Sequence, residues 1–311
     1  MKTVLKVRVA AAAALVCLGL VSGCASPADE SGHDSKAGAA TSTAPVPSGA
    51  RGTREAVSSA PAAPPDHEPV SYEPSWPDTT VRTARGHRVN TCVPKDLRNK
   101  ATTLTTSDKV HLSALVLGDG PDGVLLDHEQ GYSICSFVDI GRQLAKRGYH
   151  VMIPEYRNHG ASEEVAENEH IDRDARAGLA ELRRVGAKRV FLAGASCGGT
   201  TASVAGVDTP LRVVGLLMMS SPARCGGVDG VAAVKKLSVP TLLVVSPGDM
   251  QGNAEKQVRE VYAASVARKK KLVIQKGEWH GTSMIKRAGA SGAALQDRVI
   301  KFVVDSYAAA H

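Results

Sequence analysis

The feature that most constrains this chain is a serine bracketed by glycines, between an apolar segment and a helix-compatible one. The sequence Gly194-Ala-Ser196-Cys-Gly198 follows apolar residues 190–193 and opens the stretch 198–205, whose side chains are small. Where a strand passes directly into a helix, the turn is so tight that the positions flanking its central residue must be small, and the central residue takes strained backbone angles. The segment therefore predicts a sharp strand-to-helix turn that exposes the Ser196 hydroxyl at the end of a strand.

Short apolar runs alternate with helical patterns over most of the remaining chain. We expect strands at 111–117, 123–127, 149–154, 189–193, 213–219, 240–246 and 271–275, and helices at 137–147, 173–185, 231–237, 254–268 and 293–307. The Gly-rich stretch 118–123 is interpreted as a hairpin turn and not a phosphate loop, because a strand follows it. Strands separated by helices of this length form a parallel sheet. The predicted class is α/β, with a mostly parallel central sheet and helices on both faces.

The N-terminus has the pattern of an export signal. Basic residues precede an apolar run of 13 residues, 9–21, which is too short for a membrane-spanning helix of about 20 residues. The run ends in Leu20-Val-Ser-Gly-Cys24, which resembles the bacterial lipobox. This resemblance implies a signal peptide over 1–23 and a lipidated Cys24 that anchors an extracytoplasmic protein to the bacterial cell membrane, since two acyl chains suffice for stable anchoring.

A linker is expected over residues 24–85. Of the 41 residues from 25 to 65, 31 are Ala, Ser, Pro, Thr or Gly, and none is aromatic. Such a segment cannot bury enough apolar surface to offset its ordering entropy. The folded domain is then placed at 86–311, which is long enough for one hydrophobic core.

The charge balance argues against nucleic acid as a partner. The chain carries a net charge of +7, but three of the positive charges lie in the leader, and the chain has only 11 aromatic residues. A nucleic-acid binder would be expected to show a basic stripe with interleaved aromatic residues. No such stripe is present in the sequence. The sequence does not predict an oligomeric state.

Beyond the serine segment, three further stretches make the chain resemble the α/β-hydrolase superfamily over residues 110–308. They are 124–131, 144–162 and 239–249. A serine hydroxyl is a weak nucleophile, so it needs a base, and the base needs an orienting carboxylate. In this superfamily the nucleophile, the acid and the histidine follow one another along the chain.

The resemblance implies Ser196 as the nucleophile, His280 as the base and Asp249 as the acid. Only His280 and His311 follow Ser196, and His311 is the terminal residue. Asp249 follows the predicted strand 240–246 through a Pro-Gly turn, which puts it at the carboxyl end of a strand, where sites in such sheets lie. Asp229, after the preceding strand, is the second choice for the acid.

The oxyanion of such a reaction needs two backbone N–H donors. Cys197, directly after the nucleophile, is one expected donor, and Gln130 in the loop after strand 123–127 is the other, with Glu129 as the alternative. The sequence His128-Glu129 departs from the commoner His-Gly start of this loop. A carboxylate beside an oxyanion is unfavourable unless it points away or is paired.

Four cysteines remain in the folded part of a chain expected in an oxidising compartment. We favour a disulfide between Cys92 and Cys135. For Cys197 and Cys225, a second bridge and two buried thiols are both consistent with the sequence. No Cys or His pair has zinc spacing, so neither a metal nor a cofactor is expected.

The interval between strands 213–219 and 240–246 leaves room for no large cap, which favours an open site. The sequence therefore predicts a lipid-anchored serine hydrolase that forms an acyl-enzyme, most simply a carboxylesterase acting on a small or surface-presented ester. A peptidase or a thioesterase on the same residues is one alternative. A binding lipoprotein that uses the fold without catalysis is the other.

Overall fold

The computed structural model describes residues 79–166 and 169–310. The predicted signal peptide 1–23, Cys24 and the linker up to residue 78 lie outside the described residues. The strands are β1 (Thr80–Arg82), β2 (Arg88–Asn90), β3 (Ala101–Thr105), β4 (His111–Leu117), β5 (Asp122–Asp127), β6 (Tyr149–Pro154), β7 (Arg189–Ala195), β8 (Arg212–Met219), β9 (Arg224–Cys225), β10 (Val228–Asp229), β11 (Thr241–Val245) and β12 (Lys270–Ile274). The helices are α1 (Val138–Ala145), α2 (Asp172–Arg184), α3 (Cys197–Val207), α4 (Gly230–Val234), α5 (Asn253–Ala264), α6 (Ser283–Lys286) and α7 (Gly289–Ala308), and three 3-10 turns lie at Lys95–Lys100, Ile134–Ser136 and Asp249–Gly252.

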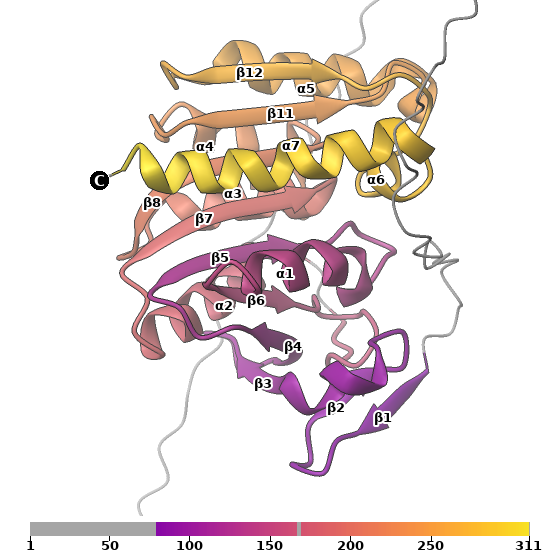
Figure 1. Cartoon of the computed structure of the whole chain (residues 1–311), viewed down its shortest axis with the longest axis vertical. Helices are drawn as coiled ribbons and strands as arrows, with labels where there is room; N and C mark the ends of the chain where they lie inside the picture. The colour runs from indigo at the N-terminus through magenta and orange to yellow at the C-terminus, as the bar shows by residue number, and fades with distance from the viewer. Residues whose placement is uncertain (1–78, 167–168, 311) are drawn as a thin grey trace, which may run out of the picture. The chain divides into compact units, whose positions relative to one another are not determined.

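An eight-stranded sheet in the order β12-β11-β8-β7-β5-β6-β4-β3 forms the centre of the fold (Figure 1). The strands from β12 to β6 run parallel, while β4 runs antiparallel to both β6 and β3. All seven predicted strands are present within about two residues of their expected ends. The α/β class with a mostly parallel sheet is thus confirmed, and β3 is an addition that the sequence did not reveal.

One predicted turn is wrong. Residues 118–121 do not close a hairpin, because β4 and β5 are not neighbours and β6 lies between them. Glycines let the chain reverse direction, but strand pairing is decided by how the apolar faces pack across the sheet.

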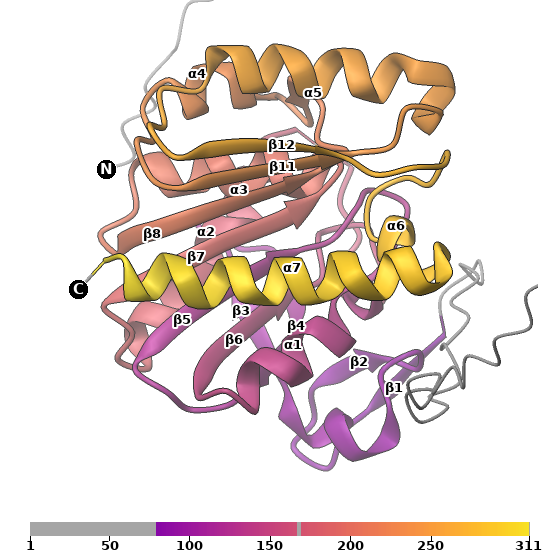
Figure 2. The same ribbon diagram turned by 45° about the horizontal axis from the view of Figure 1, so that its top comes forward.

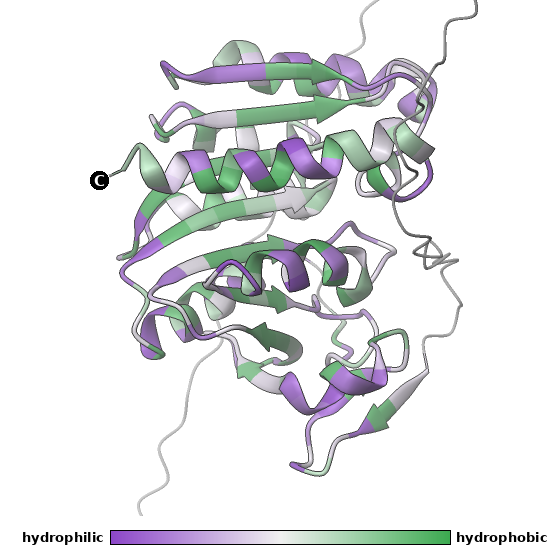
Figure 3. Ribbon diagram, viewed as in Figure 1, coloured by the Kyte–Doolittle hydropathy of each residue, from purple (hydrophilic) through white to green (hydrophobic). Residues whose placement is uncertain are grey.

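Helices cover both faces of the sheet (Figure 2). One core cluster packs α1 and α7 on one face, and the other packs α2, α3, α4 and α5 on the opposite face. The central strands are apolar along nearly their whole length, as Figure 3 shows, because helices bury them on both sides. Within residues 79–166 and 169–310, no helix combines the length and the apolar character that crossing a membrane requires.

A small hairpin of β1 and β2 precedes the sheet and begins at Thr80, six residues before the predicted domain start. Two links hold the following segment to the main body. Asn90 Nδ2 donates to Glu155 Oε1 over 3.2 Å, and the predicted disulfide Cys92–Cys135 is present with 6.2 Å between its Cα atoms. The disulfide ties this segment to the loop that follows β5.

Candidate active site

Ser196 occupies the sharp turn between β7 and α3, as the sequence predicts. It has φ 49° and ψ −130°, a strained conformation for a residue with a side chain, and it is partly exposed. The flanking glycines are required by space. A Cβ on Gly194 would collide with the backbone of Gly198, and one on Gly198 would collide with the carbonyls of Asp127 and His128.

The two residues predicted to supply oxyanion donors lie in contact. Cys197 is the first residue of α3, where N–H groups have no partner inside the helix and the helix dipole favours a negative charge. The side-chain Oε1 of Gln130 lies 3.4 Å from Cys197 Sγ. Among the described residues, neither backbone N–H donates to a protein oxygen, so both remain able to bind an anion.

A disulfide joins Cys197 to Cys225 in β9, with 5.5 Å between their Cα atoms. The sequence left this pair open between a bridge and two thiols. In the structure the two cysteines form a disulfide, which lies directly beside Ser196. The small elements β9, β10 and α4 lie between β8 and β11, in the interval that is predicted to be too short for a large cap.

Asp249 and His280 meet, as predicted. Asp249 is fully buried just after β11, and its Oδ1 lies 2.8 Å from Nδ1 of His280, whose side chain is 27% exposed. Met250 and Gln251 follow at φ 47° and 57°, so a strained turn holds the acid in place. Asp229, the second choice, instead caps α4 by accepting from Ala232 N and pairs with Arg224.

The surroundings of His280 raise the affinity of its imidazole for a proton. Burial acts to lower the pKa of His280, but the hydrogen bond and negative charge of Asp249, together with the charge of Glu129, outweigh burial and raise that pKa above its usual value. A histidine in this state is stabilised as imidazolium, which is the form that a general base becomes after it accepts a proton.

Ser196 and His280 are brought to the same edge of the sheet through Ser220. Ser196 N donates to Met219 O over 2.7 Å, and the next residue, Ser220, accepts from Gly281 N over 3.0 Å. Among the described residues, no hydrogen bond joins Ser196 directly to His280. In sites without substrate the bond between nucleophile and base is often long and tightens when substrate binds.

Glu129, the residue that departed from the expected loop sequence, is paired with the loop that carries His280. Its side chain is buried, and Oε1 accepts from both the backbone N and the hydroxyl of Thr282, each over 2.6 Å. The sequence offered no signal for this contact, because the two residues are 153 positions apart. The carboxylate thus joins the loop after β5 to the loop that carries His280.

A second group of polar residues joins the loop after β5 to residues 155–159 and to α2, and we call it the support cluster (His128, Glu155, Arg157, His159 and Asp174). His128 Nδ1 donates to Glu129 O over 2.7 Å and its Nε2 accepts from Tyr156 N, while His159 Nε2 accepts from Gly131 N. Glu155 accepts from the backbone N of Ile134 and of Ala161. These contacts fix the backbone around the predicted donor Gln130.

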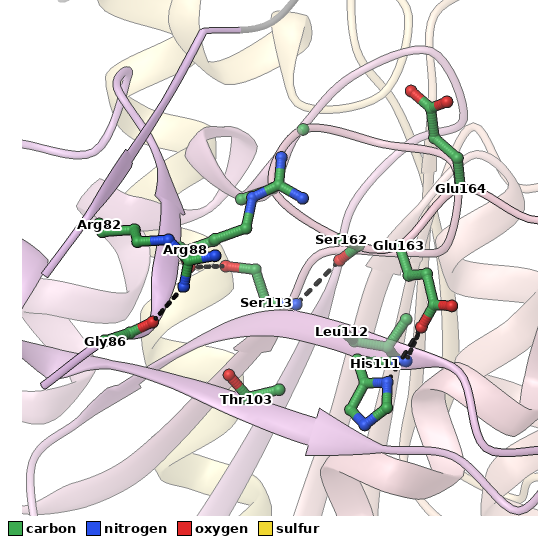
Figure 4. A pocket seen from close by; sticks show the side chains of 12 residues that line it. Arg82, Gly86, Arg88, Thr103, His111, Leu112, Ser113, Ser162, Glu163 and Glu164 are labelled. Carbon is green, nitrogen blue, oxygen red and sulfur yellow. Dashed lines mark hydrogen bonds and ion pairs between the residues drawn. The ribbon is translucent and has the colours of Figure 1, made fainter.

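A cavity of about 530 Å³ lies elsewhere, between the β1–β2 hairpin and residues 160–164. In Figure 4, Arg82 and Arg88 stand on one wall and the His111–Glu163 ion pair on the other. None of the predicted site residues lines this cavity. Within the described part of the chain, no group of three or more His, Cys, Asp or Glu side chains is arranged to hold a metal ion.

Comparison with known proteins gives a match to a protein family and several solved structures of similar fold. The family described as serine aminopeptidase, S33, matches residues 123–228, a span that contains Ser196, Cys197 and Gln130 but neither Asp249 nor His280. No curated protein matches the sequence.

Solved structures of similar fold include three hydrolytic enzymes. An esterase from Pyrococcus furiosus has 19% sequence identity and a TM-score of 0.57, covering 73% of this chain and 97% of its own. A hydrolase from Pseudomonas aeruginosa has 17% identity and a TM-score of 0.55, covering 65% and 98%. A monoacylglycerol lipase from Paleococcus ferrophilus has 15% identity and a TM-score of 0.53, covering 63% and 99%. At these identities the likeness concerns the fold.

Proposed function

We propose that this chain, whose fold is that of the α/β-hydrolase superfamily, is a serine hydrolase that cleaves a carboxylic ester. The observation that carries the proposal is the 2.8 Å contact between His280 Nδ1 and Asp249 Oδ1, at the edge of the sheet where β7 delivers Ser196. The contact holds the proton on Nδ1, so Nε2 keeps the lone pair that accepts a proton from a hydroxyl.

In the proposed mechanism, Ser196 Oγ attacks the ester carbonyl carbon while its proton passes to His280 Nε2. The N–H groups of Cys197 and Gln130 stabilise the resulting oxyanion, and Asp249 stabilises the imidazolium. Collapse of the intermediate breaks the bond to the alcohol, which takes the proton from His280. Water then releases the acid from the acyl-enzyme by the same steps.

An ester is the favoured substrate for two reasons. The elements between β8 and β11 are too small to form a large lid over Ser196, which suits a small or surface-presented substrate. The similar structures include an esterase and a monoacylglycerol lipase. A peptidase acting through the same residues is the second candidate, favoured by the match to the serine aminopeptidase family.

The decisive experiment treats the full chain, in detergent, with a fluorophosphonate probe and locates the adduct by peptide mass spectrometry. We expect labelling of the wild type on Ser196 and none in Ser196→Ala. Ser203→Ala is a matched control, since this buried hydroxyl on α3 donates to Thr200 O within its own helix, and it should label like the wild type. A folded wild type that resists the probe would overturn the proposal.

Substrate class is then separated by paired chromogenic substrates. Turnover of p-nitrophenyl esters without turnover of aminoacyl p-nitroanilides supports the esterase, and the reverse result supports the peptidase. Either activity should vanish in Ser196→Ala.

The proposal includes anchoring of the protein to the outer face of the membrane through a lipidated Cys24, on the strength of the lipobox-like sequence. Radiolabelled palmitate should enter the wild type but not Cys24→Ala, and that variant should be released from the membrane fraction. A labelled or fully membrane-bound Cys24→Ala would contradict this part of the proposal.

A further inference from the structure

Glu129 is a carboxylate that the proposed mechanism does not use. Only 1% of its surface is exposed, and it lies between the loop after β5 and the loop that carries His280. Oε1 takes two hydrogen bonds from one residue, Thr282, which stands two positions after His280. Hydrogen bonds to a charged acceptor are about twice as strong as neutral ones, so this is a firm attachment.

The backbone of the His280 loop is shaped to admit this carboxylate. Gly281 has φ 52°, and a Cβ at this position would lie 2.5 Å from Oε1 and 2.9 Å from Cγ of Glu129. On its other side, Gly281 N donates to Ser220 Oγ over 3.0 Å. The residue after His280 is thus clamped between Glu129 and Ser220, and this leaves the imidazole little freedom to move away from Ser196.

Charge adds to this mechanical effect. The ionisable groups that act on His280 are Asp249, bonded to the ring, and Glu129, whose negative charge also raises the pKa of His280. On α6, the cation Lys286 faces Glu129 and donates to Cys135 O over 2.9 Å. A second negative charge near the ring favours imidazolium, while the charge of Lys286 partly balances that of Glu129.

We propose that Glu129 is a positioning residue for His280, a second carboxylate that fixes the histidine loop through Thr282 and adds negative charge beside the imidazolium. The inference rests on the proposed role of His280 as the base. It accounts for the unusual His128-Glu129 sequence, since a glycine at position 129 could provide neither the attachment nor the charge. Asp249 holds the ring, and Glu129 holds the backbone that carries it.

The test compares Glu129→Gln and Thr282→Val with the wild-type full chain. Glutamine keeps a carbonyl acceptor for Thr282 but removes the charge, whereas valine keeps the charge but removes one of the two hydrogen bonds. Glu278→Gln is the matched control, because it removes an exposed charge two residues from His280, where water and salt screen it. Two readouts apply to each variant: the imidazole titration of His280 by NMR, and the rate of fluorophosphonate labelling against pH.

We expect Glu129→Gln to lower the midpoint of the His280 titration by roughly half a pH unit or more, and to move the acid limb of the labelling rate with it. Thr282→Val should leave the midpoint in place and reduce the plateau labelling rate by roughly threefold to tenfold, as expected for the loss of one charge-assisted bond. Glu278→Gln should match the wild type in both readouts.

An unchanged midpoint and plateau rate in Glu129→Gln would overturn the inference. If that variant does not fold, Thr282→Val decides the outcome, and a wild-type plateau rate there would equally overturn it. Failure of the proposed hydrolase function gives a different result, because the wild type itself would not label at any pH while the NMR titration would still report the influence of Glu129 on His280.

Discussion

His280 and His128 lie on neighbouring loops, and each has hydrogen-bonding partners. Their surroundings nevertheless shift their pKa values in opposite directions. His280 is partly exposed and bonded to a buried carboxylate, so its pKa is raised. His128 is fully buried, and its two nitrogens bond only to backbone groups. Burial, with the nearby His159, lowers the pKa of His128 to about 3. A histidine is suited to act as a base when a carboxylate holds one nitrogen and the other is open, and of these two histidines His280 alone meets both conditions.

The same contrast separates the predicted catalytic residues from the support cluster. The predicted catalytic residues depend on one carboxylate–imidazole contact and a strained serine turn, whereas the side chains of the support cluster are bonded to several partners each. Arg157 is an example, since its side chain is bonded to both Asp174 and Asp108 and is 2% exposed. Substitutions in the first group should therefore affect rate, and substitutions in the second group should affect stability.

The largest effect is expected for Asp249→Asn. An amide would favour the wrong tautomer of His280, so kcat/KM for an ester should fall by about 10⁴-fold. The melting temperature should change little by comparison. Steady-state kinetics with a p-nitrophenyl ester would measure the loss, and an Asp249→Asn enzyme within tenfold of the wild type would remove Asp249 from the mechanism.

Arg157→Met tests the support cluster. Removing this guanidinium leaves the buried carboxylate of Asp174 without its partner, so the free energy of unfolding should fall by about 3–5 kcal/mol. Urea denaturation followed by circular dichroism would measure it. Arg184→Met, which breaks the exposed pair with Glu181, serves as the control and should be nearly neutral. Equal effects in the two variants would argue against a structural role for the Arg157 network.

The two histidines should give stability changes of opposite sign with pH. Because the folded pKa of His128 is about 3, the unfolded chain binds a proton that the folded chain refuses as pH falls from about 6.5 toward 3, and about 4 kcal/mol of stability is lost over that interval. His280 has a raised folded pKa, so its contribution is present below about pH 6.5 and is lost as pH rises through the folded value.

Urea denaturation between pH 3.5 and 8 would measure how the free energy of unfolding changes with pH. His128→Gln should be less stable at neutral pH but lose less stability on acidification than the wild type. His111→Gln, which changes an exposed histidine, controls for the general effect of removing an imidazole. A wild type and a His128→Gln variant with parallel pH profiles would show that His128 is not the group responsible.

Removing either disulfide should give the smallest effects, and the two bridges should differ in whether they affect stability alone or also the labelling rate. Replacing Cys92 and Cys135 by serine should lower stability by about 2–4 kcal/mol and leave a labelled Ser196, because this bridge ties the N-terminal segment to the body of the fold. Replacing Cys197 and Cys225 should in addition slow fluorophosphonate labelling, because that bridge holds the turn of the nucleophile. Identical labelling rates in the two double variants would contradict this division.

Much of the fold was predictable from local sequence. The strands β4 and β6 were predicted to the residue, β4 from the alternation of its side chains and β6 from a short run that is mostly apolar. The strand β3, with the sequence Ala-Thr-Thr-Leu-Thr, was missed because it lies at the edge of the sheet and buries only two of its residues. The supposed hairpin at 118–123 failed because strand order depends on packing between distant segments.

The sequence by itself determined the turn around Ser196, because the space between Gly194 and Gly198 admits no side chain, and it placed Asp249 at the end of a strand. The tertiary structure alone decided the function of Glu129. Its partner Thr282 is 153 residues away, and no periodicity or motif relates the two. A carboxylate can be an obstacle beside an oxyanion or a support for a histidine, and the contact that the folded loops give to Oε1 of Glu129 decides which.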